Sequence, residues 1–147
     1  MQVFVVGSPL ETAMALDIPR LKKQIIECHQ ILAAIHGESK GWIHHPVVLM
    51  YSGPNSVRWL SVYADILEGY LAGYSGLMEL DKEAKEITPP FHTPEFIKQM
   101  KRRLYTKNPE HYKQWAELGE SQDNHYWSPS QQKWLVYRNG KLIQEQE

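Results

Sequence analysis

A glutamate in an amphipathic segment is the residue of this sequence that best suits acid–base chemistry. Residues 19–36 carry apolar side chains at the i, i+4 and i+7 spacing of one helical face, namely Leu21, Ile25, Cys28, Leu32 and Ile35. Glu27 lies at the edge of this face, and Arg20 and Lys23 precede it by two turns and one turn. Two interpretations stay open. Glu27 pairs with Lys23 on a solvated face, which is the commoner arrangement, or it is partly desolvated and acts as an acid or base.

The α-amine of Met1 is the second group with chemical potential. An α-amine has a reference pKa of about 8, so it is partly neutral and nucleophilic near physiological pH without special tuning. Gln2 is bulky, so we expect Met1 to be retained. The segment from Met1 to Val6 is apolar, and the Gly7 and Pro9 that follow should turn the chain back toward the helix that carries Glu27.

Other catalytic patterns are absent from the sequence. It contains no Gly-x-Ser-x-Gly, phosphate-binding glycine-rich loop, Cys-x-x-Cys or His-Glu-x-x-His pattern. Cys28 falls on the apolar face, where burial makes a thiol unreactive. His44 and His45 are adjacent and therefore do not share a helical face as metal ligands would, so a metal hydrolase is the weakest alternative. The sequence predicts no metal and no cofactor.

A run of cations on one predicted helix indicates an anionic partner. Residues 94–107 begin with Thr-Pro-Glu, a typical helix start, and place Phe96, Met100 and Leu104 on one face. The other face carries charges of a single sign, at Lys98, Lys101, Arg102, Arg103 and Lys107. The alternatives are a solvated face, or a structural role in which Arg103 holds the turn at residues 109–111.

Composition limits the class of protein. The chain has 147 residues with 42% hydrophobic and 22% charged residues, as expected for one globular domain. The single cysteine excludes an intrachain disulfide framework and fits a reducing cytoplasm. No signal peptide or membrane span is expected. The net charge of -1 gives no global attraction to nucleic acid, so any DNA contact must come from local clusters.

The predicted fold is mainly α. Three principal helices are expected near residues 19–36, 56–74 and 94–107, with Asn55 or Ser56 as the N-cap of the second. We also expect a short N-terminal strand, a capping box at Ser8 and Glu11, and short helical segments at 47–51 and 108–118. Residues 79–86 are charged and read as solvated. A C-terminal β-hairpin over 133–144 would turn at Asn139-Gly140. The organisation is a single domain, 1–147, with an extension from about residue 119.

Three blocks of the sequence resemble a known family. They are Leu16–Glu27, Gly41–Met50 and Arg102–Tyr112, and they resemble pyrimidine-dimer DNA glycosylases of the endonuclease V type, small phage and bacterial proteins. The resemblance implies that an N-terminal α-amine attacks C1′ of the damaged nucleotide to form an imine. It further implies that a glutamate on the first long helix assists base excision and strand cleavage, while basic side chains hold the duplex. Carried over, these catalytic residues are Met1 and Glu27, and the first-helix cations match Arg20 and Lys23.

The sequence therefore predicts a DNA glycosylase with AP-lyase activity on a damaged or modified pyrimidine. The alternative is a non-catalytic DNA-binding or protein-interaction module on the same fold. The expected partner is double-stranded DNA, and the protein is expected to be a monomer in the cytoplasm, or in the host-cell cytoplasm if phage-encoded. Trp42, Tyr105 and Trp127 could stack on bases or serve only in packing. The predicted DNA-binding residues are Arg20, Lys22, Lys23, His45, Lys98, Lys101, Arg102, Arg103 and Lys107.

Overall fold

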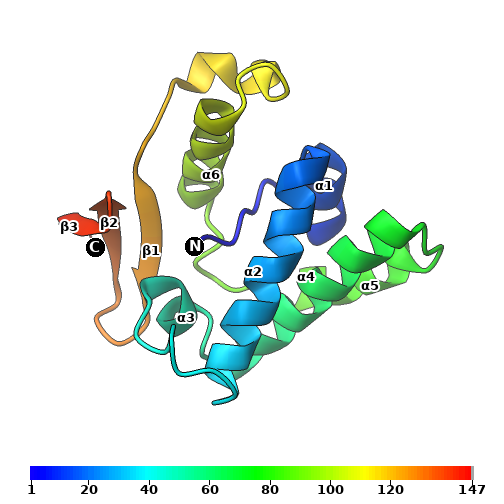
Figure 1. Cartoon of the computed structure of the whole chain (residues 1–147), viewed down its shortest axis with the longest axis horizontal. Helices are drawn as coiled ribbons and strands as arrows, with labels where there is room; N and C mark the ends of the chain where they lie inside the picture. Colours follow the sequence, from blue (N-terminus) through cyan, green and yellow to red (C-terminus); the bar gives the residue numbers. More distant parts are fainter. Residues whose placement is uncertain (147) are drawn as a thin grey trace. The chain divides into compact units, whose positions relative to one another are not determined.

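The computed structural model describes residues 1–146, which form two compact units (Figure 1). The N-terminal unit is Met1–Pro90 and the C-terminal unit is Phe91–Glu147. The boundary follows the Thr88-Pro89-Pro90 segment, where proline restricts the backbone. The single-domain organisation and the extension from about residue 119 remain predictions. A mainly helical chain is confirmed, with seven helices among the described residues.

The N-terminal unit is built around one long helix. Its helices are α1 (Pro9–Ala15), α2 (Ile18–Ile35), α3 (Pro46–Met50), α4 (Pro54–Ala72) and α5 (Leu77–Glu86). Helix α4 contacts α1, α2 and α5, and α3 packs on α2. The core along α4 is aromatic, because the Trp59 ring stacks on Tyr63 at 4.9 Å and on Tyr51 at 5.9 Å between centroids. Such stacking adds to the free energy gained from burial alone.

Local sequence signals explain where these helices begin. Proline occupies the first or second position of α1, α2, α3 and α4, where its missing N–H costs nothing. The capping box of Ser8 and Glu11 is confirmed at α1. The N-cap of α4 is Gly53, so the expectation of Asn55 or Ser56 was wrong. Pro54 starts the helix earlier than the side-chain signal suggested.

The buried face of α2 differs from the expected apolar stripe. Leu21, Cys28 and Ile31 are fully buried, and the same face carries Gln24 and Glu27. Ile25, Leu32 and Ile35 are only partly buried. The buried face of α2 thus lies closer to Gln24 and Glu27 than the apolar spacing predicted. These two side chains are buried because they hydrogen-bond the N-terminal segment.

Two other expectations for the N-terminal unit need correction. Residues 79–86 lie in α5, where Leu77 and Ala84 are buried and the carboxylate of Asp81 accepts a hydrogen bond from Leu10 N at 2.9 Å. The N-terminal strand is not confirmed, because residues 1–5 pair with no strand.

The C-terminal unit combines one helix with a small sheet. It contains α6 (Pro94–Lys107), the 3₁₀ helix η1 (Lys113–Leu118), β1 (Asn124–Ser128), β2 (Lys133–Arg138) and β3 (Lys141–Gln146). The sheet is antiparallel in the order β1-β2-β3. The predicted hairpin is confirmed, with positive φ at Asn139 and Gly140 as an Asn-Gly turn requires. Strand β1 was not anticipated, and the segment expected to be helical over 108–118 is helical only from Lys113.

Candidate active site

The N-terminal segment, residues 1–5, is held by side chains of α2. Phe4 N donates to Oε1 of Gln24 at 2.6 Å, and Nε2 of Gln24 donates to the carbonyl of Gln2 at 2.9 Å. One amide side chain thus satisfies a donor and an acceptor two residues apart, as a neighbouring β-strand would. This pairing explains how an extended segment is stable without belonging to a sheet.

Further side chains complete the hydrogen bonding of this segment. The Tyr63 hydroxyl of α4 donates to the Phe4 carbonyl at 2.6 Å, and Val6 N donates to the Thr12 hydroxyl at 3.1 Å. The side chains of Val3, Phe4 and Val5 are each no more than 2% exposed. The segment is therefore packed into the core, as its apolar composition predicted.

Glu27 is buried and bonded to the second residue of the chain. Its side chain accepts a hydrogen bond from Gln2 N at 2.8 Å, and the residue is only 7% exposed. Glu27 is thus not paired with Lys23 on a solvated face. Since the α-amine of Met1 is one residue from Gln2 N, covalent geometry keeps it within about 6.5 Å of the Glu27 oxygen. The structure brings the two predicted catalytic groups together.

His45 lies near the same amine. Burial, followed by the positive charge of the N-terminal amine, lowers the pKa of His45 to about 4. Its Nδ1 accepts a hydrogen bond from Val47 N at 3.1 Å and caps α3. In the neutral ring the proton therefore resides on Nε2, which makes that nitrogen a donor. The Trp42 ring is 42% exposed and meets the imidazole edge-on at 5.7 Å.

The predicted cations of α2 are distributed around this site. Arg20 is partly buried, with its guanidinium carbon 5.7 Å from the centre of the Phe4 ring. Lys22 and Lys23 are exposed. Arg20 therefore contributes to the packing of the N-terminal segment, while the two lysines present their charge to solvent.

The predicted cations of α6 fall into two groups. Arg102 donates to the Glu120 carbonyl at 2.6 Å and to Gln99 at 2.9 Å, and Arg103 donates to Asn124 at 3.1 Å and to the Ser121 carbonyl at 3.3 Å. These arginines tie α6 to the segment that enters β1, where Arg103 bonds Ser121 and Asn124. Lys98 and Lys107 are exposed, and the ammonium of Lys101 lies 5.7 Å from the centre of the Trp115 ring.

Gln24 and Tyr63 are the residues of the site that sequence reasoning missed. Gln24 is 1% exposed and Tyr63 is fully buried, yet both place polar atoms on the N-terminal backbone. The signal for Gln24 was available. It is a polar residue on the same helical face as Leu21 and Cys28, and buried polar groups require hydrogen-bond partners.

The remaining chemical candidates lie apart from this arrangement. Cys28 is buried, and burial together with the nearby Glu27 and Glu68 raises its pKa, so the thiol stays protonated. Among residues 1–146, no three His, Cys, Asp or Glu side chains are grouped so as to hold a metal ion. No helix in the described part of the chain has the length and apolarity to cross a membrane.

Comparison with known proteins gives one match, to a family model. Residues 1–68 match the family model of pyrimidine dimer DNA glycosylase. The matched region includes the N-terminal segment, Glu27, His45 and Tyr63, and the resemblance drawn from the sequence is confirmed over it. The family that this region matches is described as one of DNA glycosylases that act on pyrimidine dimers. No curated protein and no solved structure matches the chain significantly.

Proposed function

We propose that this protein is a DNA glycosylase with AP-lyase activity that excises a damaged or modified pyrimidine through an imine. The observation that carries the proposal is the hydrogen bond from Gln2 N to the Glu27 carboxylate, 2.8 Å long. It fixes a buried carboxylate beside the residue that carries the α-amine. A positioned amine and a carboxylate within reach of one sugar are the two groups that the reaction needs.

In the proposed reaction the neutral Met1 amine attacks C1′ of the extruded nucleotide. The bond from C1′ to the base breaks, and the base leaves with the bonding electrons and takes up a proton. The attacking nitrogen, now a secondary ammonium, gives one proton to the Glu27 carboxylate. That proton passes to the ring oxygen, whose bond to C1′ opens, and a protonated imine between Met1 and C1′ remains. We assign to Glu27 the transfer of the proton to the ring oxygen.

Strand cleavage follows from the same intermediate. The imine acidifies the C2′ proton, and the Glu27 carboxylate removes it. The electrons form a C2′–C3′ double bond, and the 3′ phosphate leaves. Water then hydrolyses the imine, which releases Met1 and the unsaturated sugar product. Glu27 acts first as an acid and then as a base, so no second carboxylate is required.

The cations are proposed to hold the duplex. Lys22 and Lys23 of the N-terminal unit supply positive charge, and Arg20 beside them packs on Phe4. His45 is neutral, so it would contribute a hydrogen bond from Nε2 rather than a charge. Lys98, Lys101 and Lys107 of α6 would contact phosphates, whereas Arg102 and Arg103 already bind backbone carbonyls of their own unit. Because the net charge of the chain is -1, binding must depend on these local groups and should weaken steeply with salt. Trp42 is exposed enough to stack on an unpaired base.

Borohydride trapping tests the proposal directly. The protein is incubated with a duplex that carries an abasic site, in the presence of borohydride, and the cross-linked peptide is identified by mass spectrometry. We expect a covalent complex through the Met1 amine. A variant with an uncleaved N-terminal extension should bind DNA without cross-linking. Cross-linking through a lysine would contradict the assignment of the nucleophile.

The net charge of -1 favours a second candidate, in which the same fold binds DNA or another protein without catalysis. The trapping experiment separates the two functions. A non-catalytic module would retain DNA without forming any covalent complex, and it would leave abasic strands intact.

A further inference from the structure

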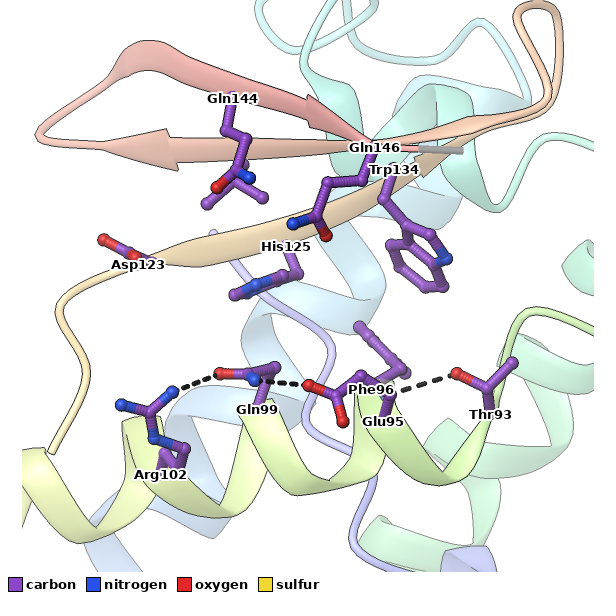
Figure 2. Close-up of a pocket in the computed structure, with 11 residues that line it drawn as sticks. Thr93, Glu95, Phe96, Gln99, Arg102, Asp123, His125, Trp134, Gln144 and Gln146 are labelled. Atoms are coloured by element: carbon purple, nitrogen blue, oxygen red, sulfur yellow. Dashed lines mark hydrogen bonds between the residues drawn. The ribbon is translucent and has the colours of Figure 1, made fainter. Parts of the chain in front are cut away.

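The C-terminal unit contains a polar cavity outside the region matched by the family model. The cavity has a volume of about 230 Å³ and lies between α6 and the inner face of the sheet (Figure 2). Figure 2 shows His125 above Gln99, and the Trp134 and Phe96 rings at one end. Pockets for drug-sized ligands span about 300–1,000 Å³, so this cavity suits a single ring system.

One wall of the cavity is a row of hydrogen-bonded side chains on α6. Gln99 donates to the Glu95 carboxylate at 2.8 Å, and it accepts from Arg102 at 2.9 Å. These residues are three and four positions apart and therefore share one helical face. The row offers a carboxylate, an amide and a guanidinium in succession, which are acceptors and donors along one line.

One end of the cavity is aromatic. Trp134 of β2 stacks on Phe96 with centroids 5.2 Å apart and an angle of 24° between the rings. Trp127 and Trp134 meet edge to face, with centroids 5.3 Å apart. A fixed aromatic surface beside a row of hydrogen-bonding groups suits a flat ligand that has a polar edge.

Two polar atoms of the lining have no hydrogen-bond partner within the described chain. They are Nε of Arg102 and Nδ1 of His125, and both atoms are buried. Most buried polar atoms in proteins are paired, so these two lining residues keep hydrogen-bonding capacity that the described chain does not use. Burial, the largest influence, lowers the pKa of His125 despite the nearby Asp123 and Glu95, so its imidazole is neutral at physiological pH and can donate and accept.

We propose that this cavity binds a nucleobase. A nucleobase is planar, fits a cavity for one ring system, and carries donors and acceptors along one edge. Glu95 would accept from a base amino group, Gln99 and His125 would bond to ring nitrogens or carbonyls, and Trp134 would contact the ring. The site does not depend on the chemistry proposed for Met1 and Glu27.

The test is calorimetric titration of the full chain with adenosine, guanosine, cytidine and thymidine, with ribose 5-phosphate as the base-free probe. We expect at least one nucleoside with an amino group to bind more tightly than thymidine, and ribose 5-phosphate not to bind. His125→Ala and Trp134→Phe should each weaken binding, the first by about tenfold as expected for one lost hydrogen bond in a buried site. Gln131→Ala, at an exposed position in the β1–β2 connection, should have no effect.

Thermal unfolding of each variant shows whether it remains folded, and Trp134→Phe preserves an aromatic ring if His125→Ala proves unstable. Two results would overturn the proposal. One is that no nucleoside binds to the wild-type protein. The other is that ribose 5-phosphate binds as tightly as the nucleosides, which would make the cavity an anion site on Arg102. Neither measurement involves DNA cleavage, so a negative result for nucleobase binding would not count against the proposed glycosylase function.

Discussion

The two units of this protein use their buried polar side chains differently. In the N-terminal unit, Gln24, Glu27 and Tyr63 all bond the backbone of residues 1–5. In the C-terminal unit, Arg102 and Arg103 bond the segment before β1, while Nε of Arg102 and Nδ1 of His125 stay unpaired beside a cavity. The first arrangement fixes a part of the chain itself, and the second leaves hydrogen-bonding capacity for a ligand. Variants of each unit can test this difference.

The largest effect is expected from Glu27→Gln. The amide retains the shape and an acceptor for Gln2 N, but it cannot transfer protons. We expect cleavage of abasic DNA to fall by about 10²–10⁴-fold, the usual contribution of a general acid or base, with unchanged DNA affinity. Single-turnover cleavage and gel-shift assays measure the two quantities. Glu38→Gln, at an exposed position, is the matched control and should cleave like the wild type.

Gln24→Leu should be the most destabilising change among the polar residues of α2. It leaves the Phe4 N–H and the Gln2 carbonyl buried without partners, each at a cost of about 1–3 kcal/mol. We expect the free energy of unfolding to fall by roughly 2–5 kcal/mol in urea titrations. Gln30→Leu on the exposed side of α2 should change it by no more than about 0.5 kcal/mol. Equal stability of the two variants would mean that the N-terminal segment is not held by Gln24.

Acid should destabilise both units through a partly buried neutral histidine in each. Burial lowers the pKa of His92 to about 3, and the pKa of His45 is lowered to about 4. The unfolded chain therefore binds more protons than the folded chain between these values and about 6.5, and stability falls as the pH drops through this window. For His92 the slope reaches at most about 1.4 kcal/mol per pH unit.

Urea unfolding at pH 7 and pH 4.5 measures this dependence. His45→Asn keeps a good N-cap for α3 but cannot titrate, and His92→Phe keeps a ring against Phe96. Each variant should lose less stability on acidification than the wild type. Gln30→Ala, at an exposed position without an ionisable group, serves as the control and should leave the pH dependence as it is.

The smallest effect concerns the cations of α6. Lys98→Ala should lower the salt dependence of DNA binding by about one unit of slope, because one phosphate contact releases about one counterion. Arg103→Ala should instead lower the free energy of unfolding, by about 1–3 kcal/mol, since it removes the bonds to Ser121 and Asn124. If the arginine variant changes the salt slope and leaves stability intact, our division of these cations is wrong.

The long helices could be predicted from the sequence because their boundaries are set by local chemistry. Pro19, Pro54 and Pro94 lie in the first turns of α2, α4 and α6, and the observed bounds agree with the expected ranges to within two residues. Asn139-Gly140 likewise specified the turn between β2 and β3. Strand β1 was missed although Pro129 follows it directly, because its pairing with β2 is a contact that the sequence does not mark.

The candidate residues could be named from the sequence, but the hydrogen bonds that hold them in place could not be predicted from it. Glu27 could be singled out from spacing and resemblance, whereas the role of Gln24 depends on a bond to a residue 22 positions away. Arg102 and Arg103 show a second limit of prediction from sequence. Their charge suggested an external anion, but carbonyl oxygens of the same unit accept their hydrogen bonds. Charge patterning in a sequence cannot distinguish these two partners.

The pairing of Gln24 with Gln2 and Phe4 also sets a register. Because the amide bonds fixed positions of the segment, the number of residues before Gln2 determines how far the α-amine extends past Glu27. One inserted residue would displace the amine by about 3.3 Å without altering any of these bonds. The protein would stay folded and keep its carboxylate in place, yet the nucleophile that we propose would miss the sugar. We therefore expect the number of residues before Gln2 to matter to the proposed site as much as the side chains within it.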